Sequence, residues 1–254
     1  MSLDLLSPTI FAFFLVFARV GAIMMLIPGI GEAFVPARVR LAIALAMSFA
    51  IFPFVQDTLP AMPGQPIQLL LLLITEITIG VFIGASAKLL MSALHVAGMV
   101  ISFQSSLGFA QFYDPAQQAQ GAIISSFMTI LGLLIVFAAD LHLLMLRASY
   151  ESYDIFPPAV LPASGDFAAL AARSVANAFT LGMQISAPFI IYALILYLGM
   201  GLLNRLMPQM QVFFIVMPLN ILLSMIFLAI TIGAALTWFG TYFNNAIGMF
   251  LGGG

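Results

Sequence analysis

Long apolar stretches separated by short polar ones dominate this chain of 254 residues. Runs of this kind predict membrane-associated helices, because about 20 apolar residues let a helix cross the hydrocarbon core of a bilayer. The pattern therefore indicates an all-α protein with about six long apolar helices. We expect them over approximately residues 9–27, 41–55, 67–108, 119–146, 164–203 and 210–242.

Two of these segments have lengths that do not suit a simple span. The segment 41–55 is short, so its helix must start earlier, tilt, or rest on protein rather than lipid. The segment 67–108 would form a helix of about 60 Å, twice the hydrocarbon thickness. It must break, kink or project beyond the membrane. Ser164 or Asp166 is a candidate cap for the next helix, and Pro188 predicts a kink within it.

The stretch 98–121 begins as helix, crosses Gly108 and becomes polar from Gln111 onward, and it carries almost no charge. Asp114-Pro115 prevents a continuous helix and favours a turn. Glutamine forms hydrogen bonds without the cost of burying a charge. Two interpretations stay open from these residues, a loop that faces an interior passage and a wet connector between membrane helices. The residues concerned are Phe109, Gln111, Phe112, Tyr113, Asp114, Pro115, Gln117, Gln118 and Gln120.

Composition narrows the class of protein. Hydrophobic residues make up 63% of the chain and charged residues only 6%, whereas soluble domains carry about 25% charged residues. The mean hydropathy is +1.19. The formal net charge of -2 gives no argument for a nucleic-acid partner. The absence of cysteine excludes disulfides, thiolate metal sites and cysteine catalysis.

One face of the segment 67–108 combines small and ionisable residues. Glu76, Gly80, Gly84, Lys88 and His95 recur at helical spacing. The two glycines form a small-xxx-small motif, which lets another helix approach closely. We expect leucine at either glycine to block subunit association.

The charges in this segment have two interpretations. In the first interpretation the protein is a secondary transporter, and a proton or substrate binds to Glu76, Lys88 and His95. Alternatively, the charged groups meet partners on neighbouring helices. Glu76 and Lys88 lie about 18 Å apart along a straight helix, too far to pair with each other. We therefore favour buried charge partners, and we include Arg205, which lies in a predicted tight turn at 204–209.

Enzyme motifs are missing from the sequence. His95 and His142 are far apart, and neither belongs to a metal-spacing motif. The chain has no G-x-S-x-G elbow and no phosphate-binding glycine loop. We therefore expect a protein that is not an enzyme and that needs no cofactor.

Six stretches of the sequence, taken in their order and spacing, extend over nearly the whole chain. They are R-V-G-A-I-M-M-L-I-P at 19–28, V-P-A-R-V-R at 35–40, E-I-T-I-G-V-F-I-G at 76–84, G-M-V-I-S-F-Q-S-S-L-G-F-A-Q-F-Y-D-P at 98–115, A-D-L-H-L-L-M-L-R-A-S-Y-E-S-Y at 139–153 and N-R-L-M-P-Q-M-Q-V-F-F-I-V-M-P at 204–218. This ordered set resembles the FliR family of flagellar type III export-gate subunits. The injectisome relatives share much of the pattern and remain the alternative.

The resemblance implies a fold of helical hairpins in which a FliP-like part is fused to a FliQ-like part. For this chain of 254 residues the parts would be roughly 1–175 and 176–254 within one unit. It also implies a complex with FliP-like and FliQ-like subunits, joined by FlhB-like and FlhA-like components in the bacterial inner membrane at the flagellar basal body. Unfolded flagellar proteins would pass through this complex. The loop 109–121 would correspond to the plug of the closed channel.

Overall fold

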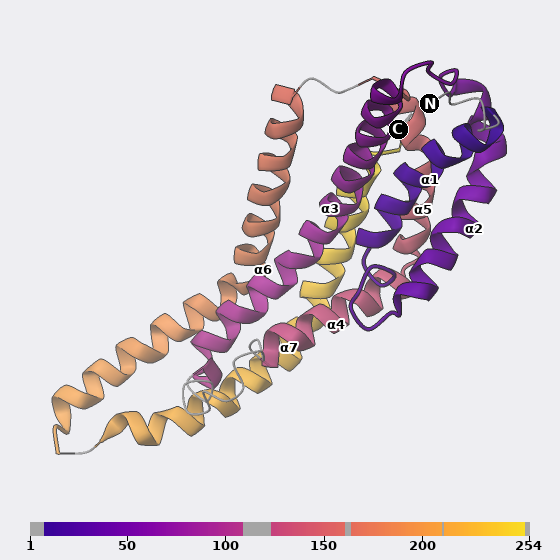
Figure 1. The fold of residues 1–254 in the computed structure, drawn as a ribbon. Helices are drawn as coiled ribbons and strands as arrows, with labels where there is room; N and C mark the ends of the chain where they lie inside the picture. Colours follow the sequence, from indigo (N-terminus) through magenta and orange to yellow (C-terminus); the bar gives the residue numbers. More distant parts are fainter. Residues whose placement is uncertain (1–7, 109–122, 161–163, 210, 252–254) are drawn as a thin grey trace. The chain divides into compact units, whose positions relative to one another are not determined.

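The computed structural model describes residues 8–108, 123–160, 164–209 and 211–251 (Figure 1). Within these ranges the regular structure is helical throughout, and the all-α prediction is confirmed there. A 3-10 turn, Gln56–Thr58, follows the second helix. The α-helices are α1 Pro8–Leu26, α2 Ala37–Val55, α3 Pro66–Gln104, α4 Ile123–Ala138, α5 Leu141–Ile155, α6 Ser164–Leu206 and α7 Val212–Gly248.

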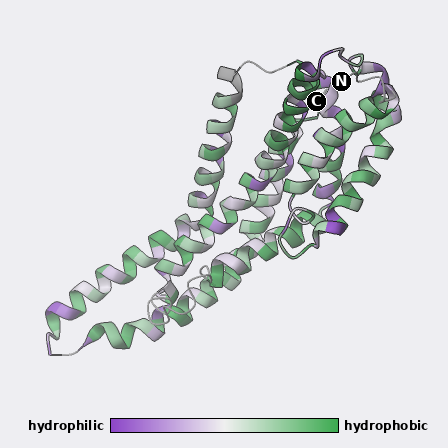
Figure 2. Ribbon diagram, in the orientation of Figure 1, coloured by the Kyte–Doolittle hydropathy of each residue, from purple (hydrophilic) through white to green (hydrophobic). Residues whose placement is uncertain are grey.

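Most of these helices are long and apolar enough to cross a membrane. Five pass this test alone, and the bent pair α4 and α5 would make a sixth as one broken span. Figure 2 shows that hydrophobic residues dominate the helices along most of their length. The protein is therefore membrane-embedded, as its composition predicts.

The bounds of α2 and α3 show how the short segment 41–55 and the long segment 67–108 form helices. Helix α2 begins at Ala37, earlier than the apolar pattern suggested, and its 19 residues contain Pro53. Helix α3 runs unbroken through 39 residues, a length of about 58 Å. It therefore exceeds the hydrocarbon thickness of about 30 Å by a wide margin.

The prediction of one helix over 119–146 is wrong. Asp140 separates α4 from α5 with a left-handed backbone, φ 56°, and the two helices are bent by 71° at this break. A left-handed residue cannot continue a right-handed helix, and Asp tolerates this conformation better than most residues do. Helix α5 then includes Arg147 and Tyr153, which lie beyond the apolar stretch 119–146.

The last two helices extend beyond their predicted limits. Helix α6 begins at Ser164 and holds Pro188 inside its 43 residues. The predicted tight turn at 204–209 is shorter in the structure, because Arg205 and Leu206 still belong to α6 and the turn comprises Pro208 and Gln209. Helix α7 has 37 residues and contains Pro218, and it ends at Gly248 rather than near residue 242.

The chain forms two compact units. Unit 1 comprises residues 1–90, 137–175 and 242–254, and unit 2 comprises residues 91–136 and 176–241. In unit 1, α1 lies beside α2, and the ring of Phe13 lies 4.4 Å from that of Phe49 (Figure 1). In unit 2, the rings of Phe189 and Phe227 lie 4.9 Å apart. The division into a FliP-like and a FliQ-like part stays a prediction.

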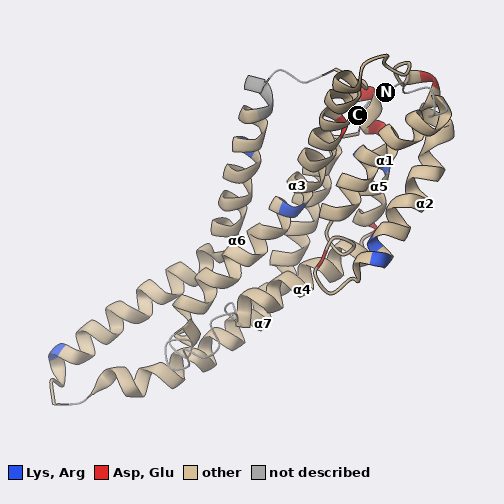
Figure 3. Cartoon of the chain, viewed as in Figure 1, with Lys and Arg blue, Asp and Glu red and all other residues tan. Residues whose placement is uncertain are grey.

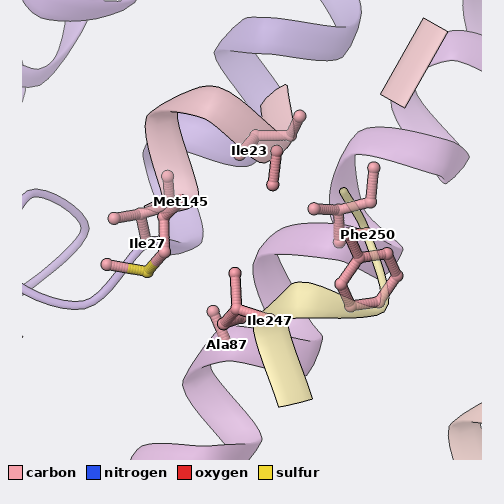
Figure 4. A pocket seen from close by; sticks show the side chains of 8 residues that line it. Ile23, Ile27, Ala87, Met145, Ile247 and Phe250 are labelled. Carbon is pink, nitrogen blue, oxygen red and sulfur yellow. The ribbon is translucent and has the colours of Figure 1, made fainter. Parts of the chain in front are cut away.

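Unit 1 encloses a small apolar cavity, which Figure 4 shows from close by. Ile23, Met145, Ile247 and Phe250 are among the side chains that line it. Its volume is about 10 Å³, at the lower limit of what holds one water molecule. A cavity with such a lining stays dry. This cavity therefore offers no room for a transported or reacting small molecule.

Candidate functional site

The predicted plug loop at 109–121 lies outside the described residues. The structure does describe the chain on both sides of it, from the end of α3 and from the start of α4. These two flanks carry the largest set of buried side-chain hydrogen bonds in unit 2 that the described residues show. We treat them as the candidate functional site and call them the α3 anchor and the α4 anchor.

The α3 anchor is built around Asn220 of α7, which is 1% exposed. Its Nδ2 donates to the carbonyl oxygen of Gln104 at 3.0 Å and to Oγ of Ser106 at 2.8 Å. The Gln104 carbonyl belongs to the last turn of α3, where carbonyl groups lack helical partners. Ser106 has a left-handed backbone, φ 62°. Asn220 therefore caps α3 and fixes the chain as it leaves the helix.

The side-chain oxygen of Asn220 also has all the hydrogen bonds that it can accept. Oδ1 of Asn220 accepts hydrogen bonds from Tyr192 Oη at 2.9 Å and from Ser224 Oγ at 3.2 Å. An asparagine amide offers two donors and two acceptor positions, so every one of them is satisfied. A fully satisfied buried network rigidifies its surroundings. It joins the end of α3 to α6 and α7 within unit 2.

The α4 anchor is built around Ser125, whose side chain is fully buried. Its Oγ donates to the carbonyl oxygen of His95 at 2.9 Å and lies 2.7 Å from Nδ1 of the same residue. Gly98 allows this approach, because a Cβ there would lie 2.8 Å from the backbone nitrogen of Ser125 and 3.0 Å from the Ile124 oxygen. The first turn of α4 is thereby held against α3.

The chemistry of the two anchors is hydrogen bonding. Neither anchor combines a nucleophile with a base and an orienting group, as covalent catalysis requires. No cluster of three or more His, Asp or Glu side chains suited to a metal ion occurs among the described residues. The arrangement can hold two helix ends in place.

Sequence reasoning missed Asn220, although an asparagine inside an apolar helix indicates that its side chain has buried hydrogen-bond partners.

The predicted glycine motif is a place of close packing within unit 1. A Cβ on Gly80 would collide with the Arg19 oxygen and lie 2.8 Å from Ala22 Cβ. A Cβ on Gly84 would lie 2.7 Å from Leu26 Cβ. The approaching helix is α1 of the same chain. A leucine at either glycine would therefore disturb the packing of α1 on α3 within this chain, in addition to any effect on subunit association.

Glu76 finds its partner at the same contact between α1 and α3. Nε of Arg19 donates to its Oε2 at 2.6 Å, and the two side chains are 0% and 1% exposed. The Nη1 group of Arg19 also donates to the carbonyl oxygens of Ser152 at 3.1 Å and Phe156 at 2.9 Å. The guanidinium lies 4.2 Å from the ring centre of Tyr153. This centre fixes the end of α5 against α1 and α3.

The other two predicted charge partners lie on the surface of the chain. Lys88 and Arg205 are both exposed in the described part of the chain, and their role as buried charge partners stays a prediction. Figure 3 shows how sparsely charged residues are distributed over the helices. The transporter hypothesis loses support, because the carboxylate of Glu76 is already engaged by Arg19.

Comparisons with known proteins agree with this description. The model of the family described as bacterial export proteins, family 1, matches residues 10–246. A flagellar biosynthetic protein FliR of Caulobacter vibrioides is 42% identical over 90% of this chain and 91% of its own length. The FliR proteins of Bacillus subtilis and Escherichia coli are 32% and 31% identical, over 86% and 80% of this chain and 85% and 77% of their own lengths.

Proposed function

Because this chain belongs to the FliR family of bacterial export proteins, we propose that it is a non-enzymatic core subunit of the flagellar type III export gate. Its relatives are flagellar proteins by name, and its long apolar helices place it in a membrane. The membrane that we propose is the bacterial inner membrane at the flagellar basal body.

The proposed mechanism is formation of a conduit for unfolded flagellar proteins. The chain would form one complex with FliP-like and FliQ-like subunits, and FlhB-like and FlhA-like components would join it. The outer surface supports assembly with other proteins. Large side chains such as Leu206, Phe214 and Ile230 are 76%, 67% and 73% exposed. Helices of this length carry more exposed apolar surface than the hydrocarbon core of a bilayer covers.

Residues 109–121 are the proposed closure element of the conduit. One observation supports this role most: buried hydrogen bonds at Asn220 and Ser125 fix the chain on both sides of the stretch. Rigid ends restrict the positions that a connecting stretch can reach. Its composition, polar with Asp114 as the single charged residue, suits a surface that meets both water and protein.

Deletion of residues 111–120 tests this mechanism. The complex should assemble in normal yield, because the α3 anchor and the α4 anchor remain. Conductance of small ions through the purified complex in planar bilayers should rise. A control of unchanged length, with Gln117, Gln118 and Gln120 replaced by Asn, should conduct no more than the unaltered complex. Unchanged conductance in the assembled deletion variant would contradict the closure role.

A further inference from the structure

The connection after α5 contains a turn at residues 157–160, which we call the strap. The N–H of Val160 donates to the carbonyl oxygen of Pro157 at 3.3 Å and closes this turn. Its third residue, Ala159, has a left-handed backbone, φ 66°. A turn with proline at its second position and a positive φ at its third usually has glycine at the third. Alanine is strained there, because its Cβ lies close to the following carbonyl oxygen.

The buried ion pair of Arg19 and Glu76 holds the strap in this conformation. The N–H of Ala159 donates to Oε1 of Glu76 at 3.4 Å, while Oε2 of the same carboxylate accepts from Arg19. Directly before the strap, the carbonyl oxygen of Phe156 accepts from Nη1 of Arg19 at 2.9 Å. Each member of the pair therefore binds the connection. Hydrogen bonds to charged groups are stronger than those between neutral groups, and here they offset the backbone strain.

The strap lies just before a part of α6 that packs little on unit 1. In the sequence, three residues separate it from Ser164, where α6 begins. Residues 168–175 of α6 belong to unit 1, and none of them is buried. Among the α6 side chains that the structure describes, Ala178 is the first buried one, and it belongs to unit 2. The docked strap therefore limits where α6 can begin.

We propose that the strap couples the contact between α1 and α3 to the position of the first part of α6. Arg19 belongs to α1 and Glu76 to α3, so movement of either helix away from the other breaks at least one of the two hydrogen bonds to the connection. Ala159 then relaxes, and the start of α6 is no longer fixed to unit 1. This coupling acts within one chain and does not depend on the proposed function.

The contact that the strap senses is a close one. Gly80 lies one helical turn after Glu76, and a Cβ at this position would collide with the carbonyl oxygen of Arg19. The backbones of α1 and α3 therefore touch at the level of the ion pair. A small separation of the two helices here is enough to part the charged groups, because hydrogen bonds weaken steeply outside their narrow range of distances and angles.

Spin labels can measure the freedom of α6, because the chain has no cysteine and introduced ones are the only attachment points. Gln56→Cys and Ala172→Cys place labels at two exposed positions of unit 1, one just after α2 and one in α6. The distribution of distances between these labels shows how firmly the start of α6 is held. Hydrogen exchange of the Ala159 amide reports on the strap itself.

The test variant is Arg19→Met with Glu76→Leu, in which apolar side chains replace the ion pair. The Ala159 amide should exchange about tenfold faster, as for the loss of one hydrogen bond, and the distance distribution should broaden. Glu151→Gln, which removes the other ion pair of unit 1, is the control and should leave both unchanged. Unaltered exchange and an unaltered distribution in the folded double variant would overturn the coupling.

Two single substitutions cover the case in which the double variant does not fold. Arg19→Lys keeps a charge beside Glu76 but lacks the guanidinium fork that also reaches the Phe156 carbonyl oxygen. The distance distribution should broaden in this variant, and an unchanged distribution would overturn the coupling. Ala159→Gly should raise the midpoint of thermal unfolding, because glycine adopts a positive φ without strain. A lower midpoint would show that the strap is not strained.

Discussion

Arg19 of α1 and Glu76 of α3 form an ion pair inside unit 1, with Nε and Oε2 2.6 Å apart. Neither side chain reaches the surface. Arg19 also caps the end of α5 through the Ser152 and Phe156 carbonyl groups. A single guanidinium therefore joins three helices that lie far apart in the sequence.

Glu76→Gln should destabilise the chain strongly, because it leaves the charge of Arg19 buried without a counter-ion. Removing one partner of a buried pair costs about 3–5 kcal/mol. The double variant Arg19→Met with Glu76→Leu should recover most of this loss, since apolar residues of similar size often replace buried pairs without cost. The midpoint of thermal unfolding of the detergent-solubilised protein measures both effects.

Glu151→Gln is the matched control for that experiment. Glu151 pairs with Arg147 one helical turn away, but the Arg147 side chain is 64% exposed. Such pairs along a helix contribute only about 0.3–0.5 kcal/mol. An unfolding midpoint of Glu76→Gln no lower than that of Glu151→Gln would show that the buried pair is not a major source of stability.

Gly80→Leu and Gly84→Leu should each prevent correct folding, because the α1 backbone lies where the new side chain would go. Gly199→Leu in α6 is the control, since no atom lies within 4 Å of its Cβ position. The control should fold normally and gain a little stability, because leucine has a better helix propensity than glycine. Size-exclusion profiles of the solubilised protein distinguish folded from aggregated chain. A monodisperse, stable Gly80→Leu protein would contradict the close packing of α1 on α3.

Asn220→Ala should loosen the end of α3, because Gln104, Ser106 and Tyr192 all lose the same partner. Each buried polar group left unsatisfied costs about 1–3 kcal/mol. Asn244→Ala, at an exposed position of the same helix, serves as the control. Amide hydrogen exchange at residues 101–106 should accelerate in Asn220→Ala alone. Equal exchange rates in the two variants would show that Asn220 does not hold this helix end.

Much of the fold follows from the spacing of apolar residues. The positions of α1, α2, α3, α6 and α7 are visible in that pattern, because each helix needs a long apolar stretch. The burial of Glu76 beside another helix also follows from the cost of a charge in an apolar segment. The pattern could not reveal that Arg19, 57 residues earlier in the chain, is its partner.

Two features could not be predicted because they depend on conformation or on distant contacts. The break at Asp140 arises from one left-handed residue within a stretch whose hydropathy suits a continuous helix. The α3 anchor pairs Asn220 with groups 114 and 116 residues away, and no local pattern encodes that contact. The glycines at 80 and 84 did predict a close helix approach, but not that α1 of the same chain is the approaching helix.

Isolation of the protein from its native membrane in mild detergent, followed by mass spectrometry of everything that remains bound, tests the proposed function most directly. We expect one large particle that contains FliP-like and FliQ-like subunits together with this chain. A homogeneous lone protein, stable without those subunits, would contradict it.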